Sequence, residues 1–599
     1  MSEGALLRVE GLSIAYDARP AVNGISFEIA RGRCLGVIGE SGAGKTQAFL
    51  GLLGLLPAAA RIAGSARFGG IELLGHGAEH LRGRRAAMIF QDPMTALTPH
   101  LRIGDQVAEP LVVHRNLSWR AARVAAAGLL EQVQMPDVAR SARRYPHEMS
   151  GGMRQRATIA MALACDPELL IADEPTTALD VSVQAQILAL LRQLMSQRAM
   201  ALAVVTHDMG VIAALADDVL VMRLGDVVEY GGVTRVLQAP AHEYTRALLA
   251  ATPRLEERRL ESGTPLVAMR ASAAQPLLVR DLKVRYRIPG GFLRPATELA
   301  AVDGVSLDVG PGEALGVVGE SGCGKSTLAR ALLRLTHPAG GEIVWLGRAI
   351  QDLDGEALRT LRDSMQIVFQ DPFASLDPRM SVAEIVAEPL RALRPSLDAA
   401  ARAARVVRML DSVGLDAGFI ARRSRELSGG QCQRVAIARA MILEPKLLVC
   451  DEAVSALDVS IQAQLLELFE AIKREHGTSI IFVSHNLAVV RQLCERVMVM
   501  YLGRVVEAGA TQAVFESPWH PYTRMLLESV PRLDPQAERA RLANLGVRGE
   551  TPSAIDRPTG CAFRTRCPAA LPMCATRSPE TEHADSRQVA CLRWRELVK

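Results

Sequence analysis

Short apolar runs that end at glycine or acidic residues are the clearest pattern along this chain. Residues 34–38 and 314–318 form two such runs, and residues 169–172 and 447–450 form two more. Uninterrupted apolar runs of this length are typical of buried parallel strands. Near the start of each half, apolar and polar residues instead alternate, which predicts an antiparallel strand with one exposed face.

Helical periodicity dominates two longer segments. Residues 91–150 and 370–428 are rich in alanine, arginine and leucine, and their apolar positions recur at helical spacing. Each segment is therefore predicted to form a mainly helical subdomain. Because buried strands and helices are mixed in each half, the predicted fold class is α/β.

An internal repeat organises the chain. Matched motifs recur at a nearly constant separation of about 280 residues, which indicates a tandem duplication of one domain of about 250 residues. We predict a first domain at 1–252, a linker at 253–276, a second domain at 277–530 and a C-terminal extension at 531–599. The linker is expected from its charged residues, followed by small residues and proline.

Each copy contains one glycine-rich loop that fits G-x-x-x-x-G-K-[ST] and directly follows a predicted buried strand. Glycines let successive backbone N–H groups converge on phosphate, lysine adds a positive charge, and the next helix adds its dipole. The loops consist of Gly39, Glu40, Ser41, Gly42, Ala43, Gly44, Lys45 and Thr46, and of Gly319, Glu320, Ser321, Gly322, Cys323, Gly324, Lys325 and Ser326.

Polar side chains follow the other apolar runs. Asp173 and Asp451, with the hydroxyls of Thr46 and Ser326, are candidate Mg²⁺ ligands. Glu174 and Glu452 come next in sequence and are candidate general bases for an attacking water. Taken alone, such carboxylates could be solvated strand ends or helix caps, but both pairs stand in register with a phosphate loop.

Glutamine and histidine follow neighbouring predicted strands in both copies. Gln91 and Gln370 are expected to bind Mg²⁺ and contact the γ-phosphate, whereas His207 and His485 are expected to contact the γ-phosphate. The alternatives are loop capping for the glutamines and a purely structural role for the histidines. Together with the loops and acidic pairs, these residues predict an ATPase that uses Mg²⁺.

Composition restricts the class of protein. The 69 basic and 65 acidic residues leave a net charge of only +4, which gives no reason to expect nucleic-acid binding. Uncharged apolar stretches are too short to span a membrane, and the first residues lack the pattern of a secretion signal. We therefore expect a cytoplasmic protein that reaches a membrane only through partners.

The Ser-Gly-Gly motifs identify the family that the chain resembles. Leu427–Gln431 is similar to the signature of ATP-binding-cassette (ABC) ATPases, and residues 149–153 are a variant with methionine at both ends. The resemblance implies tandem P-loop NTPase domains, each with an antiparallel β-subdomain and a helical subdomain. It also implies that the signature of one domain completes the ATP site of the other, and that both sites hydrolyse ATP.

The resemblance adds further candidate ATP-binding residues. In each copy they are an adenine-stacking tyrosine and the signature residues; in the second copy they also include the threonine after the loop. These residues are Tyr16, Ser150, Gly151, Gly152, Tyr286, Thr327, Ser428, Gly429, Gly430 and Gln431.

Four of the ten cysteines gather in the extension, at Cys561, Cys567, Cys574 and Cys591. Clustered thiols in a reducing compartment favour a metal over disulfides, although these spacings are wide for a zinc knuckle. The surrounding residues resemble the C-terminal extension of oligopeptide/dipeptide importer ATPases, which implies a [4Fe-4S] cluster. Zinc and a metal-free thiol group remain alternatives.

The same resemblance implies a biological role. It predicts a subunit on the cytoplasmic face of the inner membrane that hydrolyses ATP to energise import of peptides or related solutes. Its partners would be two transmembrane permease subunits and a solute-binding protein, with no nucleic acid. The alternative is a soluble ABC ATPase acting on ribosomes or in DNA repair.

Overall fold

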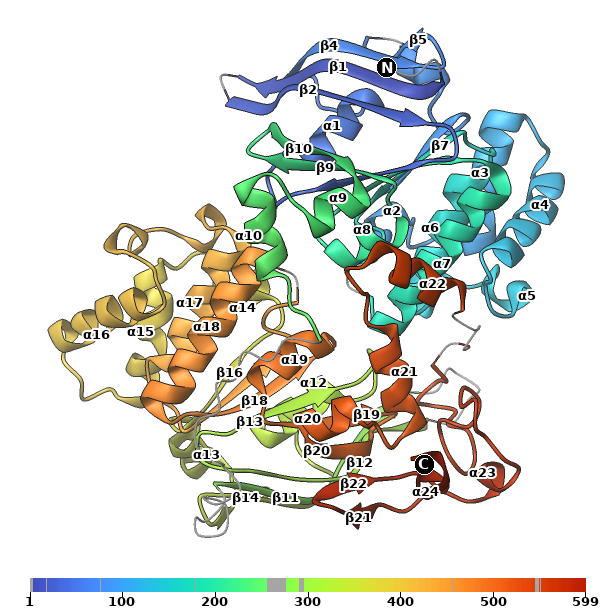
Figure 1. Cartoon of the computed structure of the whole chain (residues 1–599). Helices are drawn as coiled ribbons and strands as arrows, with labels where there is room; N and C mark the ends of the chain where they lie inside the picture. The colour runs from blue at the N-terminus through green and yellow to red at the C-terminus, as the bar shows by residue number, and fades with distance from the viewer. Residues whose placement is uncertain are drawn as a thin grey trace. The chain divides into compact units, whose positions relative to one another are not determined.

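A computed structural model describes most of the chain (Figure 1). It covers residues 4–17, 19–75, 77–177, 179–255, 276–289, 296–455, 457–544, 549 and 551–598. Most of the predicted linker, residues 256–275, lies outside the described residues. No helix among these residues is long and apolar enough to cross a membrane.

The chain divides into two compact units. The first is drawn from residues 1–252, 458–460 and 531–547, and the second from residues 253–457, 461–530 and 548–599. Each unit contains one copy of the repeat, and each is described separately below.

A six-stranded sheet forms the centre of the first unit, with strand order β10-β9-β3-β8-β7-β6. The apolar runs predicted as buried strands are β3 (Cys34–Ile38) and β7 (Leu169–Asp173), and every residue of both is buried. They pair in parallel with β8 (Ala201–Thr206). The parallel sheet expected from these runs is thus confirmed, with β6 (Ala86–Ile89) at one edge.

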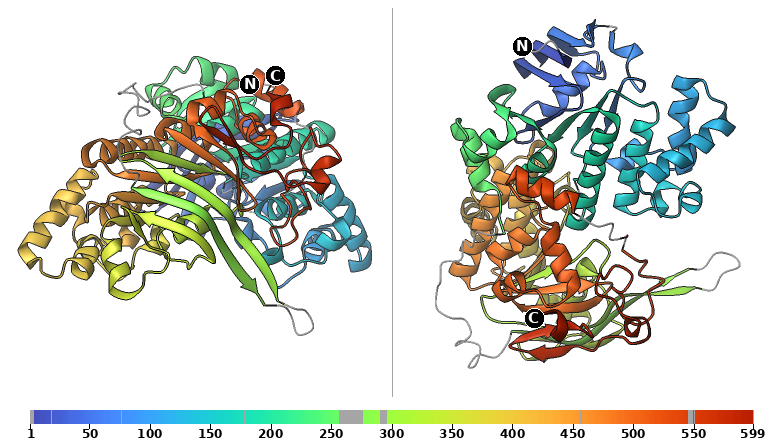
Figure 2. Two further views of the ribbon diagram at one scale, coloured as in Figure 1. Left: turned by 90° about the horizontal axis from the view of Figure 1, so that it is seen from below. Right: turned by 45° about the vertical axis from the view of Figure 1, so that its right-hand side comes forward.

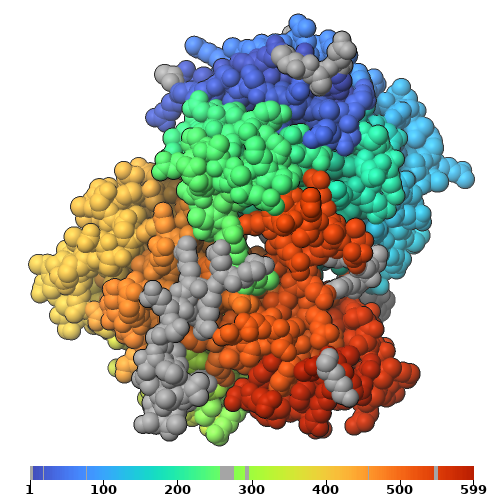
Figure 3. Space-filling model, in the orientation of Figure 1, coloured from blue at the N-terminus to red at the C-terminus, as the bar shows by residue number. Residues whose placement is uncertain are grey.

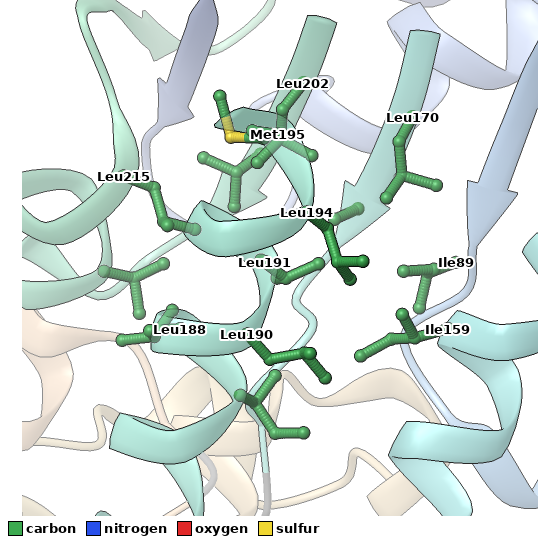
Figure 4. Packing of buried hydrophobic residues seen from close by; sticks show 14 of the residues in the cluster. Ile89, Ile159, Leu170, Leu188, Leu190, Leu191, Leu194, Met195, Leu202 and Leu215 are labelled. Carbon is green, nitrogen blue, oxygen red and sulfur yellow. The ribbon is translucent and has the colours of Figure 1, made fainter. Parts of the chain in front are cut away.

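Strand β9 (Asp218–Arg223) continues this sheet beside β3, and β10 (Asp226–Gly232) pairs with it in antiparallel fashion. Helix α7 (Val181–Arg198) covers one face of the sheet. Figure 4 shows its leucines packed toward Leu170 of β7 and Leu202 of β8. Because β6, β7 and β8 pair in parallel, their carboxyl ends lie along one edge of the sheet.

A second, antiparallel sheet opens the first unit. Strands β1 (Ala5–Tyr16), β2 (Arg19–Ala30), β4 (Ala60–Phe68) and β5 (Ile71–Glu72) are arranged in the order β2-β1-β4-β5. Alternation along β1 places Leu7 and Val9 in a core shared with α1 (Lys45–Leu52). In the space-filling view, this blue segment lies directly against the green segment that holds β9 and β10 (Figure 3).

The segment between Gln91 and Ser150 is helical, as predicted. Its elements are α2 (Pro93–Ala96), α3 (Ile103–Arg115), α4 (Trp119–Gln132) and α5 (Val138–Ser141). Helix α3 packs against α4 and against α6 (Gly151–Leu163), which begins at the Ser-Gly-Gly motif (Figure 1).

The second unit repeats this plan. Its antiparallel sheet has the order β12-β11-β14-β15, and the left view of Figure 2 shows β11 (Leu277–Ile288) beside β12 (Thr297–Val309). Strands β14 (Gly340–Trp345) and β15 (Arg348–Ala349) complete it. The helical segment contains α14 (Pro372–Ser375), α15 (Val382–Leu393), α16 (Ala399–Ser412) and then α17 (Gly429–Met441).

The central sheet of the second unit has eight strands, in the order β16-β17-β18-β13-β19-β20-β22-β21. Its parallel part consists of β16 (Met365–Val368), β17 (Leu447–Asp451), β18 (Ser479–Ser484), β13 (Ala314–Val318) and β19 (Arg496–Tyr501). Helix α12 (Lys325–Leu332) follows β13, and α18 (Val459–His476) follows β17.

The C-terminal extension is divided between the two units. Its strands β21 (Glu582–Ala584) and β22 (Arg587–Val589) extend the second sheet beyond β20 (Arg504–Ala510). In contrast, α22 (Pro535–Ala543) packs in the first unit against α7 and α8 (Met209–Leu215). The extension is therefore built into both units rather than forming a separate body.

Candidate nucleotide-binding sites

The first and last glycines of each loop lie where a side chain would collide with the backbone. A Cβ at Gly39 would stand 2.2 Å from the carbonyl oxygen of Met222, and one at Gly319 would stand 2.3 Å from that of Met500. Gly44 and Gly324 adopt φ angles of 90° and 105° immediately before their helices. The glycines thus give the loops the tight curvature that a phosphate-binding loop needs.

The loop lysines are buried inside the curves of their own loops. The Lys45 ammonium donates hydrogen bonds of 2.7 and 2.9 Å to the carbonyl oxygens of Gly39 and Glu40. Lys325 makes the same contacts at 2.7 and 3.2 Å. Burial lowers the pKa of Lys45, although nearby carboxylates favour its charged form. Each lysine thus places its charge where the loop would hold phosphate.

A hydroxyl and a carboxylate meet at the end of each central sheet. Thr46 donates to Asp173 over 3.0 Å, and Ser326 donates to Asp451 over 2.9 Å. Burial raises the pKa of Asp173 to about 6, although the Thr46 hydroxyl favours the anion. These pairs provide the oxygen ligands that Mg²⁺ prefers, so the residues present fit a magnesium site.

Three side chains converge on Glu174 in the first unit. Gln91 follows β6 and donates a hydrogen bond of 2.8 Å to Oε2, while His207 follows β8 and places Nδ1 3.0 Å from Oε1. Thr177 donates to the same carboxylate over 2.9 Å. Burial opposes the charge of Glu174, but hydrogen bonds and the charge of His207 lower its pKa to about 2. Glu174 is therefore anionic at neutral pH.

The second unit repeats the arrangement with small differences. Gln370 donates to Oε2 of Glu452 over 2.7 Å, and His485 Nδ1 lies 3.5 Å from that oxygen. The Lys325 ammonium lies 3.9 Å from Oε1. Both glutamates have positive φ angles, 48° for Glu174 and 50° for Glu452, where backbone strain often marks functional residues.

The tyrosines expected to stack on adenine and the serines of the two signature motifs lie on other elements. Tyr16 ends β1 and hydrogen-bonds Gln47 of α1, whereas Tyr286 in β11 is exposed. Ser150 caps α6 by accepting from Met153, and Ser428 caps α17 by accepting from Gln431. Helix N-termini of this kind can bind anions, so the predicted signature role is chemically suitable.

Sequence reasoning did not single out Tyr244 and Tyr522 as site residues. Their hydroxyls accept the backbone N–H of Glu40 over 3.2 Å and of Glu320 over 2.9 Å, so each holds its own loop. The signal was present, because both tyrosines stand in a His-x-Tyr-Thr-Arg motif that occurs once in each copy.

The four cysteines of the extension all line one small cavity. Burial raises the pKa of Cys561 and Cys567 and raises that of Cys591 to about 11, so these thiols are protonated. Among the described residues, no group of three or more His, Cys, Asp or Glu side chains is arranged to hold a metal ion. The thiols as placed do not fit a metal centre, and the predicted iron–sulfur or zinc site is not supported.

Comparison with known proteins agrees with this geometry. Residues 22–177 and 302–455 match the family model for the ABC transporter. These two ranges cover just over half of the chain. The chain belongs to the ABC transporter family. Residues 228–274 and 506–574 also match the model for the oligopeptide/dipeptide transporter C-terminal region.

Matches to individual relatives cover nearly the whole chain. The chain is 45% identical over 597 residues to the glutathione import ATP-binding protein GsiA of Escherichia coli (strain K12), and the match covers 93% of this chain and 95% of that relative. The protein of the same name from Shigella sonnei (strain Ss046) gives the same values. A solved dimeric ATP-binding cassette with ADP and Pi is 29% identical, covers 39% of this chain and 98% of its own, and has a TM-score of 0.36.

The two family models settle the class of activity. The chain is an ATPase with two ABC domains, and it energises the transport of peptides or related small solutes. The predictions of fold class and of ATPase activity are confirmed. These matches give no support to the alternative role on ribosomes or in DNA repair.

Proposed function

We propose that this ATPase energises the import of glutathione or similar short peptides. The supporting observation is the 45% identity to a glutathione import ATP-binding protein, which extends across both units and the extension. The chain would act on the cytoplasmic face of the inner membrane. It would work with two permease subunits and a solute-binding protein.

Each loop is proposed to bind one ATP. In the first unit, the loop N–H groups and Lys45 would hold the phosphates, while Thr46, Asp173 and Gln91 would hold Mg²⁺. When bound, Mg²⁺ would neutralise phosphate charge. In the second unit, Lys325 would hold the phosphates and Ser326, Asp451 and Gln370 would hold the ion. Tyr16 and Tyr286 would stack on adenine.

Glu174 and Glu452 are the proposed general bases. Glu174 is anionic, and Gln91 and His207 fix the direction of its two oxygens. A carboxylate held in this way can orient an attacking water and accept its proton. His207 and His485 would also contact the γ-phosphate, because each imidazole has its other nitrogen free of the glutamate contact.

The signature residues are proposed to complete the sites between the two domains. Ser150 would serve the site built on Lys325, and Ser428 the site built on Lys45. The capped N-termini of α6 and α17 support this role, because they present glycine N–H groups that can bind phosphate. Substitution Ser428→Arg should therefore weaken ATP binding in a chain whose second loop is inactivated by Lys325→Ala, and unchanged binding would contradict the composite site.

The cavity lined by the four cysteines of the extension is the candidate site for a second cofactor. All four thiols line one cavity, as an iron–sulfur cluster would require, but among the described residues no group of them is arranged to hold a metal ion, which favours a metal-free role in packing the extension. Protein purified without oxygen should be assayed for iron, acid-labile sulfide and zinc. Stoichiometric iron with sulfide would establish the cluster, and absence of all three would establish the metal-free role.

Solute uptake tests the proposed function directly. Cells that carry only the Lys45→Ala/Lys325→Ala chain should lose ATP-dependent uptake of labelled glutathione. Uptake should be restored by the unchanged chain. Normal glutathione uptake together with loss of dipeptide or tripeptide uptake would correct the solute, and normal uptake of all of these peptides would contradict the import function.

A further inference from the structure

The second phosphate loop is bound by a residue of the C-terminal extension. Arg566 donates hydrogen bonds of 2.5 and 2.8 Å to the two carboxylate oxygens of Glu320, the second residue of that loop. The Arg566 side chain is 3% exposed and the Glu320 side chain 1% exposed. Thr551, also in the extension, donates to the same carboxylate over 2.8 Å. A loop residue and an extension residue thus form a buried ion pair within one unit.

Among the described residues, the first loop has no such partner. Glu40 is the matching residue, and it is half-buried and forms no ion pair with any described residue. Arg223, the last residue of β9, instead lies over the ring of Tyr244 at 5.0 Å. In the first unit, the arginine near the phosphate loop therefore comes from the central sheet, and it contacts Tyr244, whose hydroxyl accepts from the loop.

In the second unit, the last residue of β19 is Tyr501 rather than arginine. The extension fills the same region: Phe563 packs 5.4 Å from the rings of both Tyr501 and Tyr522, and Arg566 reaches the loop. Tyr522 in turn holds the Glu320 N–H. The extension thus contacts both the side chain of Glu320 and the tyrosine that fixes its backbone.

The charge at Glu320 explains why a partner is needed. A buried carboxylate without a positive partner is costly, and here it would also repel the phosphates bound by the loop. Arg566 is matched to the carboxylate by its planar fork. A guanidinium keeps its charge in proteins. The pair therefore stays ionised and leaves little net negative charge at the loop.

We propose that Arg566 is a positioning residue for the second nucleotide site. By neutralising Glu320 and fixing its orientation, Arg566 makes ATP binding at the Lys325 loop depend on this part of the extension, whereas binding at the Lys45 loop does not depend on Arg566. This inference rests on the proposed binding of ATP by the second loop. It gives the extension a direct role in one of the two sites.

Nucleotide titration of single-site chains tests the inference. In the full chain with Lys45→Ala, trinitrophenyl-ATP reports the second loop, and Arg566→Met should raise its Kd about tenfold or more because it leaves a buried unpaired carboxylate. Removing both charges with Glu320→Gln/Arg566→Met should return the Kd to within about twofold. A general loss of stability would instead weaken nucleotide binding at both loops.

Two controls make the result specific. Arg564→Met alters the same turn at a side chain that bonds Thr559, and it should leave the Kd unchanged. In a Lys325→Ala chain, Arg566→Met should leave nucleotide binding at the first loop unchanged. If Arg566→Met fails to fold by circular dichroism, Arg566→Lys keeps the charge but loses the fork, and it should raise the Kd about threefold.

Three outcomes would overturn the inference. These are an unchanged Kd in folded Arg566→Met, an equal loss at both loops, and the absence of rescue in the double variant. Absence of nucleotide binding in the Lys45→Ala chain with Arg566 intact would instead remove the second site itself. That result would overturn the proposed ATP site, so the two failures are distinguishable.

Discussion

His207 holds the carboxylate of Glu174 through a contact of 3.0 Å between Nδ1 and Oε1. The imidazole therefore orients the proposed general base. Burial alone would lower the pKa of His207, but the hydrogen bond and the charge of Glu174 raise it. His207→Ala should reduce the kcat contribution of the first site by about a hundredfold with little change in KM for ATP. Steady-state ATPase assays in a Glu452→Gln chain measure this site alone. A large rise in KM with normal kcat would contradict the orienting role.

Both glutamates are expected to support hydrolysis, since each sits in the same arrangement. Glu174→Gln and Glu452→Gln keep the size of the side chain but remove the base, so each should lower ATPase activity to about half or less. The double variant should fall to background while still binding ATP. Full activity in either single variant would show that only one site hydrolyses ATP.

The curvature of the first loop depends on Gly39. Gly39→Ala places a Cβ 2.2 Å from the Met222 carbonyl oxygen, so the loop must shift and nucleotide binding should be lost. Gly128→Ala is the matched control, because Gly128 lies in α4 with open space around it. The control should stabilise the chain by about 0.5–1 kcal/mol through helix propensity. Thermal unfolding and nucleotide titration measure the two effects, and normal binding by Gly39→Ala would contradict the geometry.

Local patterns were sufficient to predict the frame of each candidate site. The apolar runs became β3, β7, β13 and β17, and the polar residues that follow them meet because parallel strands end at one sheet edge. Gln91 and His207 reach Glu174 for this reason. The roles of these residues in binding and hydrolysis remain predictions.

The contacts of the extension were not predictable in the same way. Arg566 stands 246 positions from Glu320, and neither residue belongs to a pattern that pairs them. Likewise, Arg539 in α22 pairs with Asp217 of the first unit at 3.2 Å, which no local periodicity indicates. The clustering of four cysteines in the extension favoured a metal centre, but closeness along the chain does not fix how buried thiols point within a cavity.

His520 is expected to make stability depend on pH. It caps α21 (Pro521–Ser529) as a neutral acceptor, and complete burial lowers its pKa to about 3. Below about pH 6.5 the unfolded chain binds a proton that the folded chain does not. The contribution of His520 to the free energy of unfolding is therefore fully present above pH 6.5. It is lost as the pH falls toward 3, by at most about 1.4 kcal/mol per pH unit.

Replacement by an uncharged cap tests this dependence. His520→Asn can still cap the helix, so its unfolding midpoint should fall less between pH 6.5 and 4 than that of the unchanged chain. His242→Asn is the matched control, since His242 caps α10 (Glu243–Ala251) in the same way but is only half-buried. Equal pH profiles for His520→Asn and the unchanged chain would contradict the assignment.

The central claim is that this ATPase works through membrane subunits, and its partners test that claim most directly. The tagged full chain should be isolated from its own cells in mild detergent, and the proteins bound to it identified by mass spectrometry. We expect two multi-span permease proteins, with a solute-binding protein retained when its solute is present. Ribosomal or DNA-repair proteins without a permease would contradict the account.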